Sequence, residues 1–560
     1  MSSNHRTESF APSVLGLALL QAGLLWLLHG SVTNATWPAT SPAILLPSYL
    51  IVLAAPLTLL VMWKYRGHRL LWAALGAMSA FLAWAGYQAF GELVGPVGEN
   101  NPHEDHIAGF VLPLALAWLI GLPLLRARLE TGRWLAPYAE LFNGSWRSYL
   151  LLAQSVLFTG VFWGLLGLCA ALFAMLGNDF FKALFADPRF VYPATAIVFA
   201  GATQLVGNRD RFVEAVLDQL LGLLKWLAPL AGLIVILFAI ALLPRLPELF
   251  SSGERVINSS ILLMLVAVTL LLINAAYRDG TVDPGYGKWI TQALRIVPPL
   301  LVVVAATALF SIVVRMNELG LTPARYWGAI TASFALLYAL GYSIASLRSG
   351  TWFASLNRVN PLLAVVLFGS LLISVTPLVD PLRLSVASQL SRALQADSPV
   401  TRDGALRYLR FDAGNLGRDT LAAIAAGAYS ADPTLRAAAG LVSTLDSKRT
   451  PTSADPAATP ERYAAWRQTL RVLPQGRTLS AGLEAALEKQ FELWASEMDP
   501  QAGAPPPQLL FLDIDADGIE EAMLMSGALR GEPSTIRDYR LFAFRDQRWA
   551  LELGGVLRNK

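Results

Sequence analysis

The chain has 560 residues, of which 55% are hydrophobic and only 15% are charged, with a mean hydropathy of +0.49. A soluble domain carries about a quarter charged residues, so this composition predicts an integral membrane protein. The small net charge of +3, without a polybasic block, argues against nucleic acid as a partner, and the single cysteine excludes an intramolecular disulfide.

Eleven apolar runs follow one another along the first two thirds of the chain, each close to the roughly 20 residues that a helix needs to cross a bilayer. The runs are 14–28, 43–63, 70–90, 107–125, 149–176, 190–206, 226–243, 257–277, 296–314, 326–345 and 362–379. The first run could instead be a signal peptide, although it lacks a clear small-x-small cleavage site. The predicted fold class is an α-helical polytopic membrane bundle of about eleven transmembrane helices, residues 1–379.

The basic residues between these runs alternate in number and so predict the orientation. One set of connections is rich in lysine and arginine, whereas the opposite set holds only Lys182, Arg189, Arg245, Arg255, Arg315 and Arg325. Because basic segments stay on the cytoplasmic side, the N-terminus is predicted to be cytoplasmic. An odd number of crossings then leaves everything after Val379 outside, which in a bacterium places the chain in the inner membrane with a periplasmic C-terminal region.

Residues 380–500 change from long apolar runs to amphipathic segments, which predicts a periplasmic helical region. Three helices are predicted to begin with a capping residue followed by proline, at Asp380-Pro381, Asp432-Pro433 and Thr459-Pro460, and a fourth at Ser480. Stretches around Ser453 and from Gly503 to Gln508 are typical of linkers. Alternating apolar segments in residues 508–560, including the turn at Asp546-Gln547, predict a small C-terminal β module.

The sequence DIDADG, which begins at Asp513, has carboxylates at alternate positions before a glycine, as calcium loops do. The candidate ligands are Asp513, Asp515, Asp517, the carbonyl of Ile519 and Glu521. Position twelve is Leu524 rather than glutamate and the flanks resemble strands, so the loop is not an EF-hand. We expect a structural calcium ion that ties two strands of a small module. An Asp-rich turn without metal is the alternative, because Asp and Gly favour turns in any case.

The sequence constrains the possible activities mainly through the recognisable motifs that it lacks. No catalytic nucleophile setting, phosphate loop or intramembrane acid pair is evident, so the sequence does not support an enzyme. The sequence gives only weak support for coupled transport, because ion and proton paths use ionisable residues and the span interiors contain almost none. Prolines at 113, 193, 229 and 298–299 nevertheless interrupt several spans, and broken helices can line a cavity.

Short motifs occur in a fixed order along the chain. They are DPRFVYP from Asp187, NAAYRDG from Asn274, GLTPAR from Gly320, LGY from Leu340, RVNPLL from Arg358, DPLRLSVASQLSR from Asp380 and YLRFDAGNLG from Tyr408. In this order they resemble the bacterial membrane family catalogued as domain of unknown function 4153. Together they span about half of the chain. The family pattern favours an aromatic residue where this chain has Leu416. The resemblance implies a multi-pass bacterial membrane protein and carries over no catalytic residues.

Several of these motifs fall at span ends, where two interpretations compete. Such residues commonly cap helices and anchor them at the interface. Alternatively, Arg315, Arg325, Arg383 and Arg392 form a surface for a lipid headgroup or a protein partner, because guanidinium groups bind phosphate and carboxylate well.

Three functions therefore remain open from the sequence. The first is a non-enzymatic envelope protein that presents a periplasmic binding or sensing domain to a protein or lipid partner. The second is a transporter or lipid-handling carrier, and the third is a membrane enzyme acting on a lipid or glycan. We expect the first.

Overall fold

The computed structural model describes most of the chain, with short gaps. The described residues are 12–93, 104–134, 136–207, 210–247, 258–278, 284–347, 356–396, 398–445, 459–498, 506–513, 520–528, 536–545 and 548–558. They form two compact units, Met1–Ser443 and Thr444–Lys560. The predicted linker around Ser453 and the predicted turn at Asp546-Gln547 lie outside the described residues.

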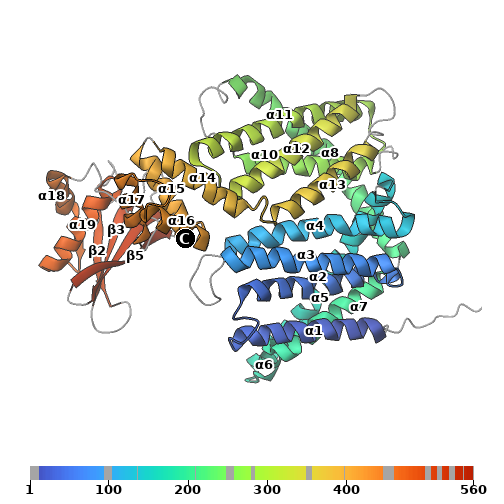
Figure 1. Cartoon of the computed structure of the whole chain (residues 1–560), viewed down its shortest axis with the longest axis horizontal. Coiled ribbons are helices and arrows are strands. Elements are labelled where there is room, and N and C mark those ends of the chain that lie inside the picture. The colour runs from blue at the N-terminus through green and yellow to red at the C-terminus, as the bar shows by residue number, and fades with distance from the viewer. Residues whose placement is uncertain are drawn as a thin grey trace, which may run out of the picture. The chain divides into compact units, whose positions relative to one another are not determined.

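The described residues of the first unit include eleven helices that are long and apolar enough to cross a membrane, as the sequence predicted (Figure 1). They are α1 (Pro12–Thr33), α2 (Pro42–Val61), α3 (Arg69–Leu93), α4 (Glu104–Thr131), α5 (Tyr138–Met175), α7 (Pro188–Gly207), α8 (Asp210–Leu242), α10 (Ser259–Tyr277), α11 (Lys288–Leu319), α12 (Pro323–Leu347) and α13 (Leu356–Ser374). Short elements η1 (Trp63–Tyr65), α6 (Phe180–Ala186) and η2 (Leu243–Arg245) join some of them. The chain is therefore a multi-pass membrane protein.

These helices are apolar on most of their surface, as expected where lipid replaces water. Large apolar side chains such as Leu157, Trp226 and Met264 are exposed. The last long helix, α13, returns to pack against α4, so distant parts of the chain lie side by side (Figure 1).

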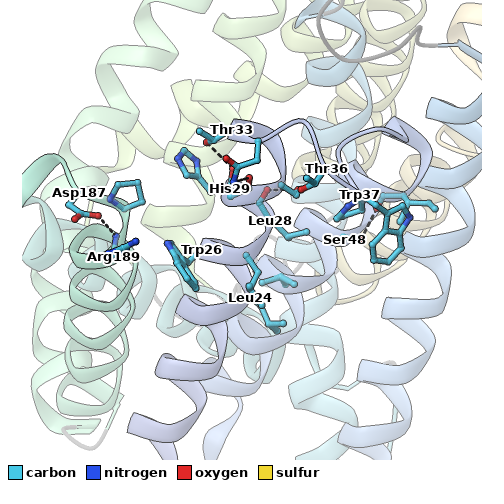
Figure 2. A pocket seen from close by; sticks show the side chains of 18 residues that line it. Leu24, Trp26, Leu28, His29, Thr33, Thr36, Trp37, Ser48, Asp187 and Arg189 are labelled. Atoms are coloured by element: carbon cyan, nitrogen blue, oxygen red, sulfur yellow. Dashed lines mark hydrogen bonds between the residues drawn. The ribbon is translucent and has the colours of Figure 1, made fainter.

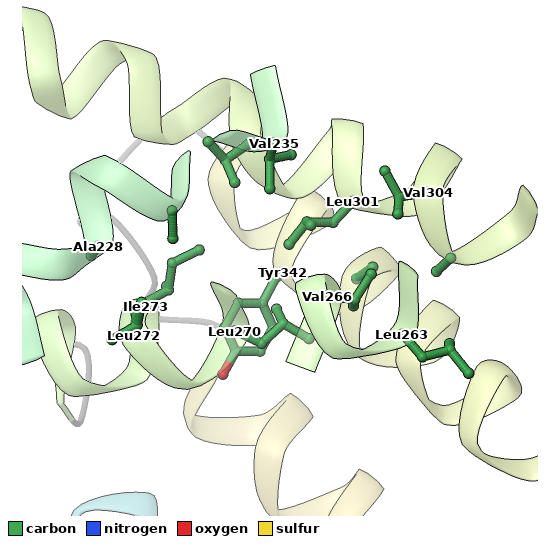
Figure 3. Close-up of a cluster of buried hydrophobic side chains, with 14 of the residues drawn as sticks. Ala228, Val235, Leu263, Val266, Leu270, Leu272, Ile273, Leu301, Val304 and Tyr342 are labelled. Atoms are coloured by element: carbon green, nitrogen blue, oxygen red, sulfur yellow. The ribbon is translucent and has the colours of Figure 1, made fainter. Parts of the chain in front are cut away.

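The largest buried cluster lies among α8, α10, α11 and α12 (Figure 3). Val235, Val266, Leu301 and Val304 are buried there, and the ring of Tyr342 lies among them with no exposed surface. Small residues allow close approach of the helices, since an added Cβ at Gly232 of α8 would lie 2.9 Å from Leu294 Cδ2.

Four shorter helices follow α13 within the first unit. They are α14 (Pro381–Gln395), α15 (Pro399–Phe411), α16 (Gly414–Ala425) and α17 (Pro433–Ser443). The predicted starts at Asp380 and Asp432 are confirmed, because Asp380 accepts bonds from the amides of Leu382 and Arg383, and Asp432 accepts one from that of Thr434. The sequence analysis missed α15 and α16, although Ser398 precedes Pro399 with the same signature and caps α15.

The second unit combines two helices with a five-stranded sheet. Its elements are α18 (Pro460–Thr469), β1 (Arg471–Leu473), α19 (Ala481–Met498), β2 (Gln508–Leu512), β3 (Glu521–Ala528), β4 (Ile536–Arg545) and β5 (Arg548–Arg558). The strands lie in chain order, with β1 parallel to β2 and the other neighbours antiparallel. The predicted C-terminal sheet and the helix starts at Thr459 and Ser480 are confirmed, whereas β1 was not predicted.

Buried aromatic side chains join the helices of the second unit to its sheet. Trp466 of α18 and Phe491 of α19 pack with their ring centroids 5.3 Å apart, against Leu509 and Phe542 of the sheet. By packing, α14 to α17 thus belong with the membrane helices, and α18 and α19 belong with the strands. The sequence analysis divided the chain into 1–379, 380–500 and 508–560 by composition and expected membrane topology. The packing units do not test that division, which stays a prediction.

Candidate functional site

Four polar side chains from four helices meet inside the membrane bundle. Tyr138 is the first residue of α5, Asn274 lies in the last turn of α10, Tyr342 lies near the end of α12, and Asn360 lies near the start of α13. Three of these positions belong to the NAAYRDG, LGY and RVNPLL motifs. The fold therefore brings together residues that are up to 222 positions apart in the sequence.

The oxygen of Asn274 is the centre of this hydrogen-bonded group. Asn274 Oδ1 accepts bonds from the hydroxyl of Tyr342 at 2.5 Å, the hydroxyl of Tyr138 at 3.2 Å and Asn360 Nδ2 at 3.3 Å. Asn360 Nδ2 also donates to the Tyr342 oxygen, at 3.0 Å. We call these four residues the polar cluster. All four are uncharged, which suits a site in a low-dielectric bundle, where hydrogen bonds join helices.

One atom of the polar cluster has no bonding partner. Asn360 is only 7% exposed, and its Oδ1 accepts no hydrogen bond from any described residue. Reversing the Asn360 amide would not help, because its oxygen would then face Asn274 Oδ1, which is also an acceptor. A buried acceptor left unpaired costs about 1–3 kcal/mol, and because this atom has almost no accessible surface, a donor reaches it only if neighbouring side chains move.

A cavity of about 850 Å³ begins at the polar cluster and extends between α4, α5, α10, α12 and α13. Tyr138, Asn274 and Asn360 line one end, and the remaining wall is made mostly of apolar side chains such as Leu116, Phe334 and Leu367. None of the described residues that line it is charged. Along α4 its wall runs from Ala108 to Leu124, which is about 24 Å at 1.5 Å per residue. This length exceeds one leaflet, about half of a core of roughly 30 Å.

Prolines lie in the wall of this cavity. Pro113 and Pro123 lie inside α4 and Pro361 lies inside α13, and all three line the cavity. Proline removes a backbone hydrogen bond and bends a helix, which helps to keep neighbouring helices apart. Of the prolines that the sequence analysis named as interrupting spans, Pro113 is the one that lines this cavity.

A second cavity, of about 960 Å³, is lined by charged residues near the ends of several helices. Its basic side chains are Lys64, Arg66, Arg126, Arg147 and Arg278, and its acidic side chains are Glu130, Glu140, Glu214 and Asp218. The two signs largely balance, and Arg278 Nη1 lies 2.8 Å from Asp218 Oδ1. Burial and a hydrogen bond to Glu130 raise the pKa of Tyr65 to about 12, so the phenol stays protonated and donates. The lining of this cavity therefore favours neither anionic nor cationic ligands.

A third cavity, of about 840 Å³, lies at the end of α1 beside the starts of α2 and α7 (Figure 2). Asp187 accepts a bond from the amide of Arg189 at 2.8 Å and so caps α7. The His29 ring of α1 packs against that of Tyr192, with centroids 5.7 Å apart. Trp26 and Trp37 are exposed at its rim, as is typical of side chains at a membrane interface. The DPRFVYP motif thus caps and packs helices here.

The predicted calcium ligands are only partly described. Asp513 is exposed directly after β2, and Glu521 is buried at the first position of β3, paired with Leu512. Asp515, Asp517 and Ile519 lie outside the described residues. Within the described part, no group of three or more His, Cys, Asp or Glu side chains is arranged to hold a metal. Beside the loop, Arg477 forms an ion pair with Glu520 and stacks 3.9 Å from the centroid of Phe511. The calcium site stays a prediction.

The sequence analysis did not predict the polar cluster. It placed the three motifs at span ends without bringing them together, and it began the fifth span at Tyr149, eleven residues after Tyr138. A signal was nevertheless present, because Asn274, Tyr342 and Asn360 each lie near a span end that the basic residues assign to the same side.

Comparisons of the chain with protein-family models, with curated proteins and with solved structures find no match. The resemblance to domain of unknown function 4153 is therefore neither confirmed nor contradicted.

Proposed function

We propose that this chain is a non-enzymatic protein of the bacterial inner membrane that binds a lipid-like molecule in the cavity beside the polar cluster. The proposal rests on an apolar cavity longer than one leaflet, one end of which is lined by Asn360, whose buried Oδ1 has no donor among the described residues. A fitting ligand has a long apolar chain and an uncharged hydroxyl or amide group that donates to Asn360. Water-soluble substrates fit poorly, since the apolar wall offers them few hydrogen bonds.

We further propose that the N-terminus is cytoplasmic and that residues 380–560 are periplasmic, where the second unit binds or senses a protein or lipid partner. The alternation of basic residues supports this orientation. The calcium loop fits the same orientation, because isolated sites in extracellular modules bind at about 10⁻⁴–10⁻³ M, which is useful only outside the cytosol. Membership of the family with domain of unknown function 4153 is part of this proposal, and it rests on the order of the motifs.

A lipid-handling carrier is the second candidate. The observation in its favour is that Pro113, Pro123 and Pro361 lie inside the helices of the cavity wall, where each removes a backbone hydrogen bond and so weakens the helix beside the site. A carrier has to move its ligand between leaflets or across the membrane, whereas a sensor only has to bind it.

The test of ligand binding is native mass spectrometry of the full-length protein extracted from its own membranes. Ala364 of α13 lines the cavity, and the Ala364→Phe variant should fill it and lose the bound molecule. Val365→Phe is the matched control, because Val365 is the next residue, is 37% exposed and does not line the cavity. Asn360→Leu, of similar volume but without a polar atom, should lower occupancy about tenfold. Equal occupancy in Ala364→Phe and Val365→Phe would rule the site out.

A further inference from the structure

Three arginines from three helices gather at the opposite ends of the membrane helices from the polar cluster. Arg315 lies near the end of α11, Arg325 lies in the first turn of α12, and Arg392 lies in the last turn of α14. Arg325 and Tyr342 are 17 residues apart on α12, which is about 25 Å. Arg315 and Arg392 both lie close enough to Arg325 to repel its charge.

These arginines form no ion pair with a described carboxylate. The ion pairs of the described residues form elsewhere, for example Arg278–Asp218 and Arg407–Asp403. Glu318 is the acid nearest to Arg315 in α11, and it forms no ion pair with any described basic residue. Like charges held together without a counterion destabilise a fold, so this arrangement favours an external anion.

The guanidinium of Arg325 is held by the turn between α11 and α12. Arg325 Nη1 donates to the carbonyl oxygens of Leu319, at 3.1 Å, and Gly320, at 2.6 Å. These bonds occupy one nitrogen of the guanidinium, and no described residue accepts from Nε or Nη2. The side chain is thus positioned in advance, with donors left for a ligand.

The same turn is fixed to α14, the helix that carries Arg392. Gln389 Nε2 donates to the carbonyl oxygen of Leu319, at 3.1 Å, and the amide of Leu321 donates to Ser388 Oγ at 3.0 Å. Gly320 has φ +74°, and a Cβ there would lie 2.5 Å from Gln389 Nε2, so only glycine fits. The turn therefore holds α14 close to Arg325.

The local backbone adds to the positive potential. Arg325 is the third residue of α12, and the N-terminus of a helix carries a partial positive charge that disfavours a basic side chain. The next residues, Tyr326 and Trp327, are aromatic, as is typical of the headgroup layer. Positive charge is thus concentrated at the ends of the membrane helices, where we expect the lipid phosphates.

We propose that Arg315, Arg325 and Arg392 bind a phosphate group at this membrane boundary. Guanidinium groups make paired, charge-assisted hydrogen bonds to phosphate oxygens, which suits a group with several equivalent oxygens. The phosphate belongs either to an anionic lipid headgroup or to a soluble phosphate. The site is separate from the cavity beside the polar cluster, so the failure of either proposal leaves the other intact.

Binding is tested with the full-length protein in an uncharged detergent, by native mass spectrometry and by thermal unfolding. The probes are inorganic phosphate, short-chain phosphatidylglycerol and, as a lipid control without net charge, short-chain phosphatidylcholine. The variants are Arg315→Gln and Arg392→Gln. Arg358→Gln is the matched control, since it removes an exposed arginine from the start of α13, away from this site.

Each of the two test variants should weaken binding of phosphatidylglycerol at least about tenfold, whereas Arg358→Gln should not. Stabilisation by phosphatidylglycerol alone identifies a headgroup site, and equal stabilisation by inorganic phosphate identifies a soluble anion. Without any probe, both test variants should unfold at the same temperature as the wild type or higher, because a like-charge repulsion is removed. Unchanged binding in both variants, or no binding of either anion by the wild type, would overturn the proposal.

Discussion

At the scale of single residues, Tyr342 shows how much of the polar cluster depends on one hydroxyl. That hydroxyl both donates to Asn274 and accepts from Asn360 while its ring is fully buried. Tyr342→Phe should therefore lower the free energy of unfolding by about 1 kcal/mol, the usual size for such bonds between membrane helices. Tyr326→Phe is the control, because Ser374 Oγ is the one described group that bonds to the Tyr326 hydroxyl, and it should cost less. Unfolding in a denaturing detergent measures both, and equal losses would contradict a special role for Tyr342.

Asp432 is a residue whose charge state should matter for stability. The hydroxyl and amide of Thr434 donate to its carboxylate and hold its pKa below the ordinary value of 3.8. Because the folded pKa is lowered, this stabilisation is present above pH 3.8 and is lost as the pH falls through the folded pKa. Hydrogen exchange of α17 amides, corrected for intrinsic rates, should rise below that pH. Asp432→Asn keeps the cap without the titration and should remove this pH dependence; an unaltered dependence in the variant would exclude Asp432 as its source.

At the scale of elements, α12 and α13 are packed closely beside the polar cluster. A Cβ at Gly341 would lie 2.4 Å from Val359 Cγ1, and the neighbours of these two residues are Tyr342 and Asn360. Gly341→Ala should push the helices apart and destabilise the protein by about 1–3 kcal/mol, as overpacking does. Gly369→Ala of α13 is the control, since nothing lies within 4 Å of its added Cβ, and it should be neutral or stabilising. Equal stability of both variants would show that the helices can adjust freely.

The elements also show what the sequence can and cannot predict. All eleven spans were predictable, because length and apolar composition decide whether a helix can cross a bilayer. The polar cluster was not, since the meeting of Asn274, Tyr342 and Asn360 depends on how the helices pack. Helix α16 begins after Ala413, with no side-chain cap, so no local signal marked it. A Cβ at Gly417 of α16 would lie 2.3 Å from the backbone oxygen of Leu409 in α15, a constraint that appears only in three dimensions.

At the scale of the whole molecule, stabilisation of the second unit by calcium is a test of the predicted calcium loop. If the loop after β2 binds calcium at about 10⁻⁴ M, then 1 mM calcium should stabilise the second unit by about 1.4 kcal/mol. Hydrogen exchange of β2 and β3 in the full-length protein should slow accordingly, and Asp515→Ala should abolish the effect. Magnesium at the same concentration is the control, because it requires a tighter octahedral shell. Exchange rates that do not respond to calcium in the wild type would favour the plain turn.

The orientation of the membrane helices determines whether that loop lies on the calcium-rich side of the membrane. The number of membrane helices makes this orientation testable. With eleven crossings and a cytoplasmic N-terminus, a phosphatase fused after Lys560 should be active, because the enzyme matures only outside the cytoplasm. A fusion after Gly132, between α4 and α5, should be inactive, since the basic residues around it predict a cytoplasmic connection. The opposite pattern in two full-length fusions would invert the topology. It would also move the arginine site to the cytoplasmic leaflet and leave the acidic loop in a fluid with too little calcium to bind.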